Sequence, residues 1–249
     1  MTSTERRPLS AKVCVVTGGA GTLGGAIARR FVTDGALVML ADLDEETARA
    51  AADAIGAASR QVDVADQVSV EGLIDAAVER YGRLDVLVNN AGVLCPSARI
   101  HNQTANNWER AIAVNLLGVV YGMTAAIRVM RTQVSGGAIV NTGSVAALTA
   151  WSHSGPYGAT KAAVVQLTKI AALEYATDGI RVNCVCPGLF DSAMLAGLPD
   201  EAVEAARARH PAGTGQAEDV VGAFAYLASD DARWTTGVAL PVDGGYAVQ

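Results

Sequence analysis

The segment that decides the fold is Lys12-Val-Cys-Val-Val-Thr17-Gly-Gly-Ala-Gly-Thr-Leu-Gly24. Its β-branched first half predicts a buried strand over Lys12–Thr17, and the stretch after it predicts a helix over Leu23–Asp34. Glycines between a strand and a helix allow a tight turn and a close approach to a pyrophosphate, whose charge is stabilised by N–H groups at the helix start. The spacing G-x-G-x-x-G is met by Gly19, Gly21 and Gly24. Because the chain has 26 glycines, a plain glycine-rich turn is the alternative, but the flanking strand and helix favour a dinucleotide site.

Short β-branched runs alternate with alanine-rich stretches of helical length along the whole chain, which is typical of repeated βαβ units and a parallel sheet. The predicted strands are Lys12–Thr17, Ala36–Ala41, Ser59–Val62, Leu84–Val88, Gly137–Asn141, Ile180–Val185 and Val238–Val242. The predicted helices are Leu23–Asp34, Glu45–Ile55, Gln67–Tyr81, Thr104–Arg131, Pro156–Ala176 and Ala217–Ser229. Left-handed caps are expected at Gly35, Gly82 and Gly179, each of which follows a predicted helix.

This pattern predicts an α/β fold, a Rossmann fold in which a doubly wound, seven-stranded parallel sheet carries helices on both faces. No linker or charge block divides the chain, so we expect a single dinucleotide-binding and catalytic domain over residues 1–249. Residues 188–215 mix apolar, small and charged side chains, and they form either an ordinary excursion or a substrate lid.

Composition narrows the class of protein. The 249 residues are 51% hydrophobic and 18% charged, which excludes disorder. No apolar run reaches the roughly 18 residues of a membrane span, and the first ten residues lack the apolar stretch of a signal peptide, so a cytoplasmic protein without membrane contact is expected. Net charge is −6 with the 19 basic residues dispersed, which argues against nucleic acid as a partner. The four cysteines are expected to be buried free thiols.

Asp42 ends the second predicted strand, 24 residues beyond Gly18. A carboxylate at this place accepts hydrogen bonds from both hydroxyls of an adenine ribose, and it would repel a 2′-phosphate. No Lys or Arg stands in the glycine loop (residues 18–24) or beside Asp42 to offset that repulsion. NAD(H) is therefore favoured over NADP(H), and the alternative is that Asp42 merely caps the next helix.

Tyr157 and Lys161 lie four residues apart at the start of a predicted helix, directly after Pro156. This spacing places them on one helix face. A tyrosine with a pKa near 10 becomes a base near neutral pH only if that pKa falls by about two to three units, which a neighbouring ammonium group and an oxidised nicotinamide ring favour. Alone, the pair would be an ordinary helix surface pair.

Together these motifs resemble the short-chain dehydrogenase/reductase family, especially its NAD-dependent secondary-alcohol dehydrogenases of about 250 residues. The resemblance runs from about Leu9 to Gln249. It is carried by Thr17–Gly24, Asp63-Val64, Asn89-Asn90-Ala91-Gly92, Asn115, Ser144, Tyr157 with Lys161, Pro187-Gly188 and Val242-Asp243-Gly244-Gly245. One departure is Thr22, which stands where the family's loop has its middle Gly or Ala.

The resemblance implies a role for each matching residue. Tyr157 would be the general acid or base, Lys161 would lower its pKa and bind the nicotinamide ribose, and Ser144 would hold the substrate oxygen. Asn115 would anchor a proton-relaying water. The implied cofactor contacts are Gly18, Gly21, Thr22, Leu23, Gly24, Asp42, Leu43, Asp63, Val64, Asn90, Ala91, Gly92, Tyr157, Lys161, Pro187, Gly188 and Ser192.

The implied activity is NAD(H)-dependent interconversion of a small secondary alcohol and a ketone. Candidate substrate contacts are Ser144, Ala146, Trp151, His153, Tyr157, Leu189 and Met194, and they suggest an uncharged, mostly apolar molecule. For His153, a solvated or packed loop residue is the alternative. No metal site is expected, because the three histidines share no ligand spacing. The family's habit of pairing helices Thr104–Arg131 and Pro156–Ala176 between subunits implies a homotetramer.

Other classes of function stay open. An NADPH-dependent 3-oxoacyl thioester reductase uses the same scaffold, although Asp42 argues against it. A non-catalytic nucleotide-binding regulator would have a broken Ser/Tyr/Lys set, whereas this set is intact. A serine hydrolase is disfavoured because Ser144 lacks the second glycine of G-x-S-x-G. A sugar-nucleotide epimerase or dehydratase would need a larger substrate-binding region.

Overall fold

The computed structural model describes residues 7–192, 194–195 and 200–248. Residues 1–6 and 249 of the expected domain, and residues 193 and 196–199 of the expected lid, lie outside this part of the chain.

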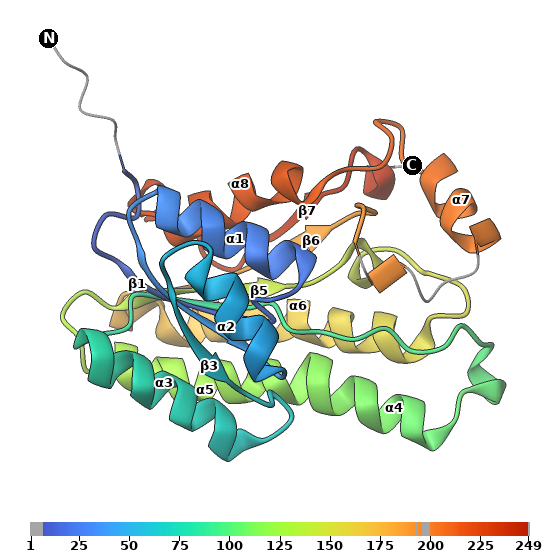
Figure 1. The fold of residues 1–249 in the computed structure, drawn as a ribbon. Helices are drawn as coiled ribbons and strands as arrows, with labels where there is room; N and C mark the ends of the chain where they lie inside the picture. The colour runs from blue at the N-terminus through green and yellow to red at the C-terminus, as the bar shows by residue number, and fades with distance from the viewer. Residues whose placement is uncertain (1–6, 193, 196–199, 249) are drawn as a thin grey trace, which may run out of the picture.

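The core of the molecule is a seven-stranded sheet in which every neighbouring pair is parallel (Figure 1). Its order is β3-β2-β1-β4-β5-β6-β7, so the chain winds outward in both directions from β1. The strands are β1 (Val13–Thr17), β2 (Leu37–Asp42), β3 (Ala58–Gln61), β4 (Val86–Asn89), β5 (Gly137–Thr142), β6 (Ile180–Pro187) and β7 (Ala239–Val242). The predicted sheet is confirmed, with ends that differ by one to two residues.

Helices cover both faces of the sheet (Figure 1). They are α1 (Thr22–Thr33), α2 (Glu45–Asp53), α3 (Gln67–Tyr81), α4 (Ala105–Ala111), α5 (Gly118–Met130), α6 (Gly155–Tyr175), α7 (Asp200–Ala208) and α8 (Ala217–Ala228). Buried side chains of α1, α2 and α8 share one apolar cluster with the sheet, and those of α3, α5 and α6 share another. Strands β1, β2, β4, β5 and β6 are therefore enclosed on both sides, which explains their lack of polar alternation, whereas the edge strands β3 and β7 are only partly buried.

Helix ends follow the expected chemistry. Gly82 and Gly179 are left-handed C-caps with φ of 81° and 71°, and Gly35, two residues before β2, has a φ of 93°. At the N-terminal end of α2, the side chain of Asp44 accepts a hydrogen bond from the Thr47 N–H at 2.8 Å. Asp42 is therefore not the cap of α2, and that alternative interpretation was wrong.

The predicted helix Thr104–Arg131 is one continuous rod with an irregularity in its middle. A π-helical turn over Ile112–Leu117 joins α4 to α5 and carries Asn115. Periodicity alone did not predict this turn. The joined helix Ala105–Met130 is long and apolar enough to cross a membrane, contrary to the expectation that no segment is. Core helices of soluble proteins meet the same criteria, and α5 packs on α3 and β4.

The segment after β6 differs most from the sequence prediction, because it contains helix α7, which was not predicted. The base of this excursion is closed by backbone hydrogen bonds from Asp191 N to Gly215 O and from Gly215 N to Leu189 O, both 3.1 Å. Its ends therefore lie together beside the sheet.

Three of the four cysteines are buried free thiols as expected, namely Cys14, Cys184 and Cys186. Cys95 is only half-buried, because it lies in the loop after β4 rather than in a strand, and that part of the prediction was wrong. Among the described residues no cluster of three or more His, Cys, Asp or Glu side chains is arranged to hold a metal ion.

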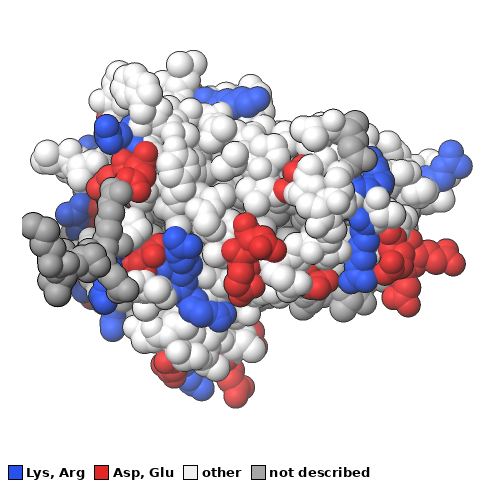
Figure 2. Space-filling model, turned by 90° about the horizontal axis from the view of Figure 1, so that it is seen from above, with Lys and Arg blue, Asp and Glu red and all other residues white. Residues whose placement is uncertain are grey.

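Charged side chains of both signs lie interspersed on the face shown in Figure 2. Over the surface as a whole, some ion pairs connect separate elements, such as Lys12 with Asp230 at 2.8 Å and Arg131 with Asp178 at 2.9 Å. Exposed pairs of this kind contribute little to stability.

Candidate active site

The glycine loop crosses the carboxyl end of β1, where the strand order reverses between β1 and β4. Gly18 has a φ of 63°, and a Cβ there would lie 2.8 Å from the Ala91 Cα. A Cβ on Gly24 would collide with the Gly18 carbonyl oxygen. Both positions therefore require glycine, and the loop can bring bare backbone against a phosphate at the start of α1.

Asn90 joins the glycine loop to the end of β4. Its side-chain Nδ2 donates to the carbonyls of Thr17 at 3.0 Å and Gly18 at 3.2 Å. The Thr17 hydroxyl in turn accepts from the backbone N–H groups of Asn90 at 3.0 Å and Ala91 at 3.2 Å. The predicted contacts Gly18, Asn90 and Ala91 therefore lie side by side, and Thr17 is the residue that holds them.

The Asp42 carboxylate faces the glycine loop from the end of β2. Its Oδ2 accepts from Ala20 N at 2.9 Å and its Oδ1 from Leu43 N at 2.8 Å. The Leu43 side chain is exposed. This position next to the loop fits a ribose-binding acid, because the ribose of a dinucleotide lies beyond the pyrophosphate.

Asp63 and Val64 follow β3 at the same edge of the sheet. Asp63 is exposed, and its Oδ1 accepts from Ala65 N at 2.9 Å. Val64 is half-buried, and its carbonyl oxygen lies 3.0 Å from where a Cβ on Gly118 would be. Asp63 and Val64 thus lie at the carboxyl edge of the sheet, next to the strand end that carries Leu43.

Asn115 is fully buried in the π-helical turn, and both ends of its amide bind Val93. Oδ1 accepts from Val93 N at 2.8 Å, and Nδ2 donates to Val93 O at 2.9 Å. A Cβ on Gly92 would lie 3.3 Å from Asn115 Oδ1 and 3.5 Å from Lys161 Nζ. The loop after β4 is thus fixed where Asn115 and Lys161 converge.

Ser144, Tyr157 and Lys161 meet between β5 and the first turns of α6, and all three are buried. Lys161 Nζ donates to the Thr142 carbonyl at 2.7 Å and lies 5.8 Å from the Tyr157 ring centroid. The Ser144 hydroxyl accepts from Ala146 N at 3.1 Å. The predicted catalytic residues are therefore brought together in one enclosed cluster.

Burial shapes the ionisation of this cluster. It lowers the pKa of Lys161 from 10.5 to about 8. It raises the pKa of Tyr157 above its ordinary value, although a hydrogen bond with Ser144 opposes that change. Desolvation disfavours a charged group of either sign, so the two shifts have one cause. In the protein alone, the pKa of Tyr157 does not fall in the way that a base near neutral pH requires.

A buried histidine, whose role sequence reasoning did not predict, supports the loop after β6. His210 Nε2 accepts from Leu189 N at 2.9 Å, and its Nδ1 lies 2.7 Å from the Ala206 carbonyl, which fixes the Nδ1–H tautomer. The ring stacks on Tyr246 with centroids 4.6 Å apart. A Cβ on Gly188 would lie 2.9 Å from Nε2, so glycine is required there.

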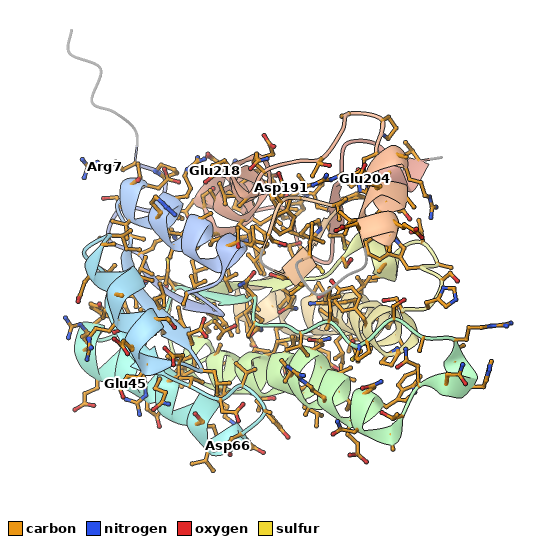
Figure 3. All side chains as sticks on the ribbon, turned by 45° about the vertical axis from the view of Figure 1, so that its right-hand side comes forward. Arg7, Glu45, Asp66, Asp191, Glu204 and Glu218 are labelled. Carbon is orange, nitrogen blue, oxygen red and sulfur yellow. The ribbon has the colours of Figure 1, made fainter. Side chains whose placement is uncertain are left out.

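One ion pair connects α7 with the loop after β6, and a second lies within α7. Arg207 bridges Glu204 at 2.8 Å and Asp191 at 3.3 Å, and both carboxylates are labelled in Figure 3. Of the remaining predicted cofactor contacts, Pro187 ends β6, Gly188 follows it directly, and Ser192 is half-buried.

The predicted substrate contacts fall into two groups. Ala146, whose N–H donates to Ser144, and Leu189, whose N–H donates to His210, are buried, and Met194 is 43% exposed. Trp151 and His153 instead line a separate open hollow. Arg99 and His101 line the same hollow, and the sequence analysis did not assign these two residues to a site.

The fold and the cluster of Ser144, Tyr157 and Lys161 beside a glycine loop define a dinucleotide-binding oxidoreductase. Residues 18–247 match a family model described as enoyl-(acyl carrier protein) reductase. The chain is 42% identical over 240 residues to the cis-4-hydroxycyclohexanecarboxylate dehydrogenase of Sinomonas cyclohexanicum, covering 94% of this chain and 96% of that protein. It is 42% identical over 248 residues to 3beta-hydroxysteroid dehydrogenase 1 of Eggerthella lenta, covering 95% of this chain and 94% of that protein.

The crystal structure of levodione reductase is similar to this fold with a TM-score of 0.92 at 31% identity, covering 96% of this chain and 99% of that chain. The chain belongs to the short-chain dehydrogenase/reductase family. Its relatives act on CH–OH groups, and the family implies a nicotinamide cofactor. The expected family and class of enzyme are thus confirmed.

Proposed function

We propose that this protein is an NAD(H)-dependent dehydrogenase that interconverts a small secondary alcohol and a ketone, with Tyr157 as the general acid and base. The observation that carries the proposal is the buried cluster of Ser144, Tyr157 and Lys161, which abuts Gly92 in the loop after β4. The glycine loop lies at the end of β1, the strand next to β4, and its backbone is so closely packed that a Cβ at Gly18 or Gly24 would clash.

In alcohol oxidation the Tyr157 phenolate takes the hydroxyl proton of the substrate, and in ketone reduction the phenol returns it. Ser144 holds the substrate oxygen, and Lys161 provides a positive charge beside the developing phenolate. When bound, an oxidised nicotinamide supplies the hydride acceptor and a further positive charge. Because burial alone raises the pKa of Tyr157, that added charge is needed before the phenol can act as a base.

The choice of NAD(H) rests on Asp42. Its carboxylate is held against the glycine loop by Ala20 N and Leu43 N, where a 2′-phosphate would meet like charge. No Lys or Arg occurs in residues 17–24 or 41–44 to compensate. We propose that Asp42 binds the ribose hydroxyls and excludes NADP(H).

The test is reduced-nicotinamide absorbance with NAD⁺ or NADP⁺ and a panel of cyclic and linear secondary alcohols. We expect turnover with NAD⁺, a loss of about 10²–10⁴-fold in Tyr157→Phe, and unchanged folding of that variant. Asp42→Ser should raise the KM for NAD⁺ at least about tenfold and narrow the gap to NADP⁺. Activity with NADP⁺ alone, strongest on 3-oxoacyl thioesters, would support the thioester reductase instead, and no activity with either cofactor would favour the nucleotide-binding regulator.

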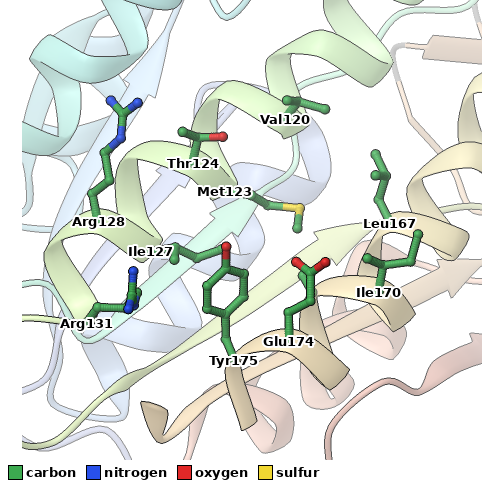
Figure 4. Close-up of a pocket in the computed structure, with 11 residues that line it drawn as sticks. Val120, Met123, Thr124, Ile127, Arg128, Arg131, Leu167, Ile170, Glu174 and Tyr175 are labelled. Atoms are coloured by element: carbon green, nitrogen blue, oxygen red, sulfur yellow. The ribbon is translucent and has the colours of Figure 1, made fainter. Parts of the chain in front are cut away.

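For its quaternary structure we propose a homotetramer in which α5 and α6 pair with a second copy. A hollow of about 300 Å³ lies between these helices, with apolar side chains of Met123, Ile127, Leu167 and Ile170 on its walls (Figure 4). Arg131 and Glu174 border it, and charges of opposite sign on one face suit a twofold self-contact. Sedimentation should show an assembly that Ile170→Glu weakens, and a stable wild-type monomer would contradict this.

A further inference from the structure

A second hollow lies between residues 98–101 and residues 151–155 at the start of α6. Its volume is about 660 Å³, and its walls include Arg99, His101, Trp151, Ser152, His153 and Gly155. Gly155 begins α6, and Tyr157 follows two residues later, which is about 3 Å of helix rise. The hollow and Tyr157 therefore lie at the same, N-terminal end of α6.

The walls of this hollow carry hydrogen-bond donors and positive charge. No acidic side chain is among its described lining residues. The guanidinium of Arg99 has no side-chain partner within the described chain, and it offers the planar fork that matches a carboxylate. His101 and Ser152 add ring N–H and hydroxyl groups to the same wall.

Trp151 contributes a donor that lacks an acceptor. Its indole Nε1 is the one buried side-chain nitrogen or oxygen among the described residues with no hydrogen-bond partner. The ring lies edge-on to Tyr246, with centroids 6.1 Å apart, so Trp151 separates the hollow from the His210–Tyr246 stack behind Gly188. A buried donor without an acceptor costs free energy, which a ligand oxygen that reaches Nε1 would recover.

His153 is held in an unusual conformation at the rim. Its φ of 67° lies in the left-handed region, which is uncommon for a residue with a side chain. The conformation is pinned by a hydrogen bond from Ala98 N to the His153 carbonyl at 3.0 Å and by the Ala98–Ser154 bridge. The ring is oriented by Ser152, whose Oγ lies 2.9 Å from Nδ1. The structure thus fixes both the Arg99 segment and the His153 segment around the same opening.

We propose that this hollow is an anion subsite that binds a carboxylate at the end of the substrate remote from the reacting carbon, with Arg99 as the charged partner. The inference rests on the proposed function and names its substrate class as hydroxy acids of about the size of a substituted cyclohexane. It replaces the expectation of an uncharged substrate, which considered the residues around Ser144 and Tyr157 but not Arg99.

The test compares matched substrates in the full-length protein. With NAD⁺, kcat/KM is measured for 4-hydroxycyclohexanecarboxylate, its methyl ester and 4-methylcyclohexanol. We expect the acid to exceed the ester at least tenfold, and this advantage to shrink as salt screens the charge. Arg99→Gln should lose at least tenfold on the acid, mainly through KM, and stay within twofold on 4-methylcyclohexanol. Arg29→Gln, which removes an exposed charge on α1, is the control and should change neither.

A binding measurement separates this inference from the proposed function. Cyclohexanecarboxylate has no hydroxyl to oxidise, so its calorimetric titration does not depend on turnover. Binding that weakens at least tenfold in Arg99→Gln, and less strongly in Trp151→Phe, supports the subsite even if no alcohol is oxidised. Equal turnover of acid and ester together with no Arg99-dependent binding would overturn it, and tighter binding of inorganic phosphate than of the carboxylate would overturn the assignment to hydroxy acids.

Discussion

Replacing Lys161 with methionine should change how stability depends on pH, because the folded protein bears the cost of a buried ammonium group. Lys161 is 3% exposed, and burial lowers its pKa from 10.5 to about 8. Below pH 8 the folded and unfolded chains both hold the proton, so the folded state bears the full cost. Between pH 8 and 10.5 the folded protein has released the proton while the unfolded chain keeps it, and the free energy of unfolding rises with pH.

One unit of pKa corresponds to about 1.4 kcal/mol, so the rise attributable to Lys161 is roughly 3 kcal/mol across this window. Methionine has similar length and no charge, and Lys161→Met should lack that rise. The lost hydrogen bond to Thr142 O contributes at both pH values and largely cancels in the comparison.

The assay is urea unfolding of wild type and Lys161→Met at equal protein concentration, at about pH 7 and about pH 10. We expect the wild type to gain about 2–3 kcal/mol relative to the variant at the higher pH. The other two lysines, and the tyrosines and cysteines away from Lys161, titrate alike in the two proteins, so their contributions cancel in the comparison. A wild-type-to-variant difference that is the same at both pH values would refute the argument from burial.

Two further substitutions test the geometry of the site. Gly24→Ala places a Cβ against the Gly18 carbonyl, so we expect a loss of about 1–3 kcal/mol in stability and a weaker affinity for NAD⁺ in calorimetry; unchanged binding would contradict a close-fitting loop. Asn115→Ala leaves both backbone groups of Val93 without their partners, and thermal unfolding should show a loss of about 2–4 kcal/mol. A Tm within about 1 °C of wild type would show that Asn115 does not hold the loop.

Much of the fold could be predicted because its signals are local. Strands enclosed on both faces give apolar runs, and Gly82 and Gly179 mark helix ends through a backbone conformation that only glycine adopts without strain. Helix α7 could not be found in this way, because Asp200–Ala208 buries no residue and its apolar residues, apart from Val203, are alanines that give only a weak hydrophobic pattern.

In the site, too, residues in local motifs could be predicted, and residues placed by tertiary packing could not. Gly18, Asp42, Ser144 and Tyr157 lie in short motifs whose spacing is set by one strand or one helix. The role of His210 depends on Gly188, which is 22 residues away, and on Tyr246, so it follows from tertiary packing and not from spacing. Arg99 has no motif around it, and only the fold brings it to the loop that carries His153.

The π-helical turn lets the two halves of one helix, α4 and α5, present their side chains in different directions. An extra residue in a helix rotates the residues after it by about 100° relative to the residues before it. The α4 half can therefore turn Trp108 toward Gly155 at the hollow, while the α5 half turns Met123 and Ile127 toward the groove with α6. Deleting a single residue between Ile112 and Leu117 would restore a regular helix and force these two surfaces out of phase. The proposed substrate subsite and the proposed subunit contact would in this way be free to change separately along one helix.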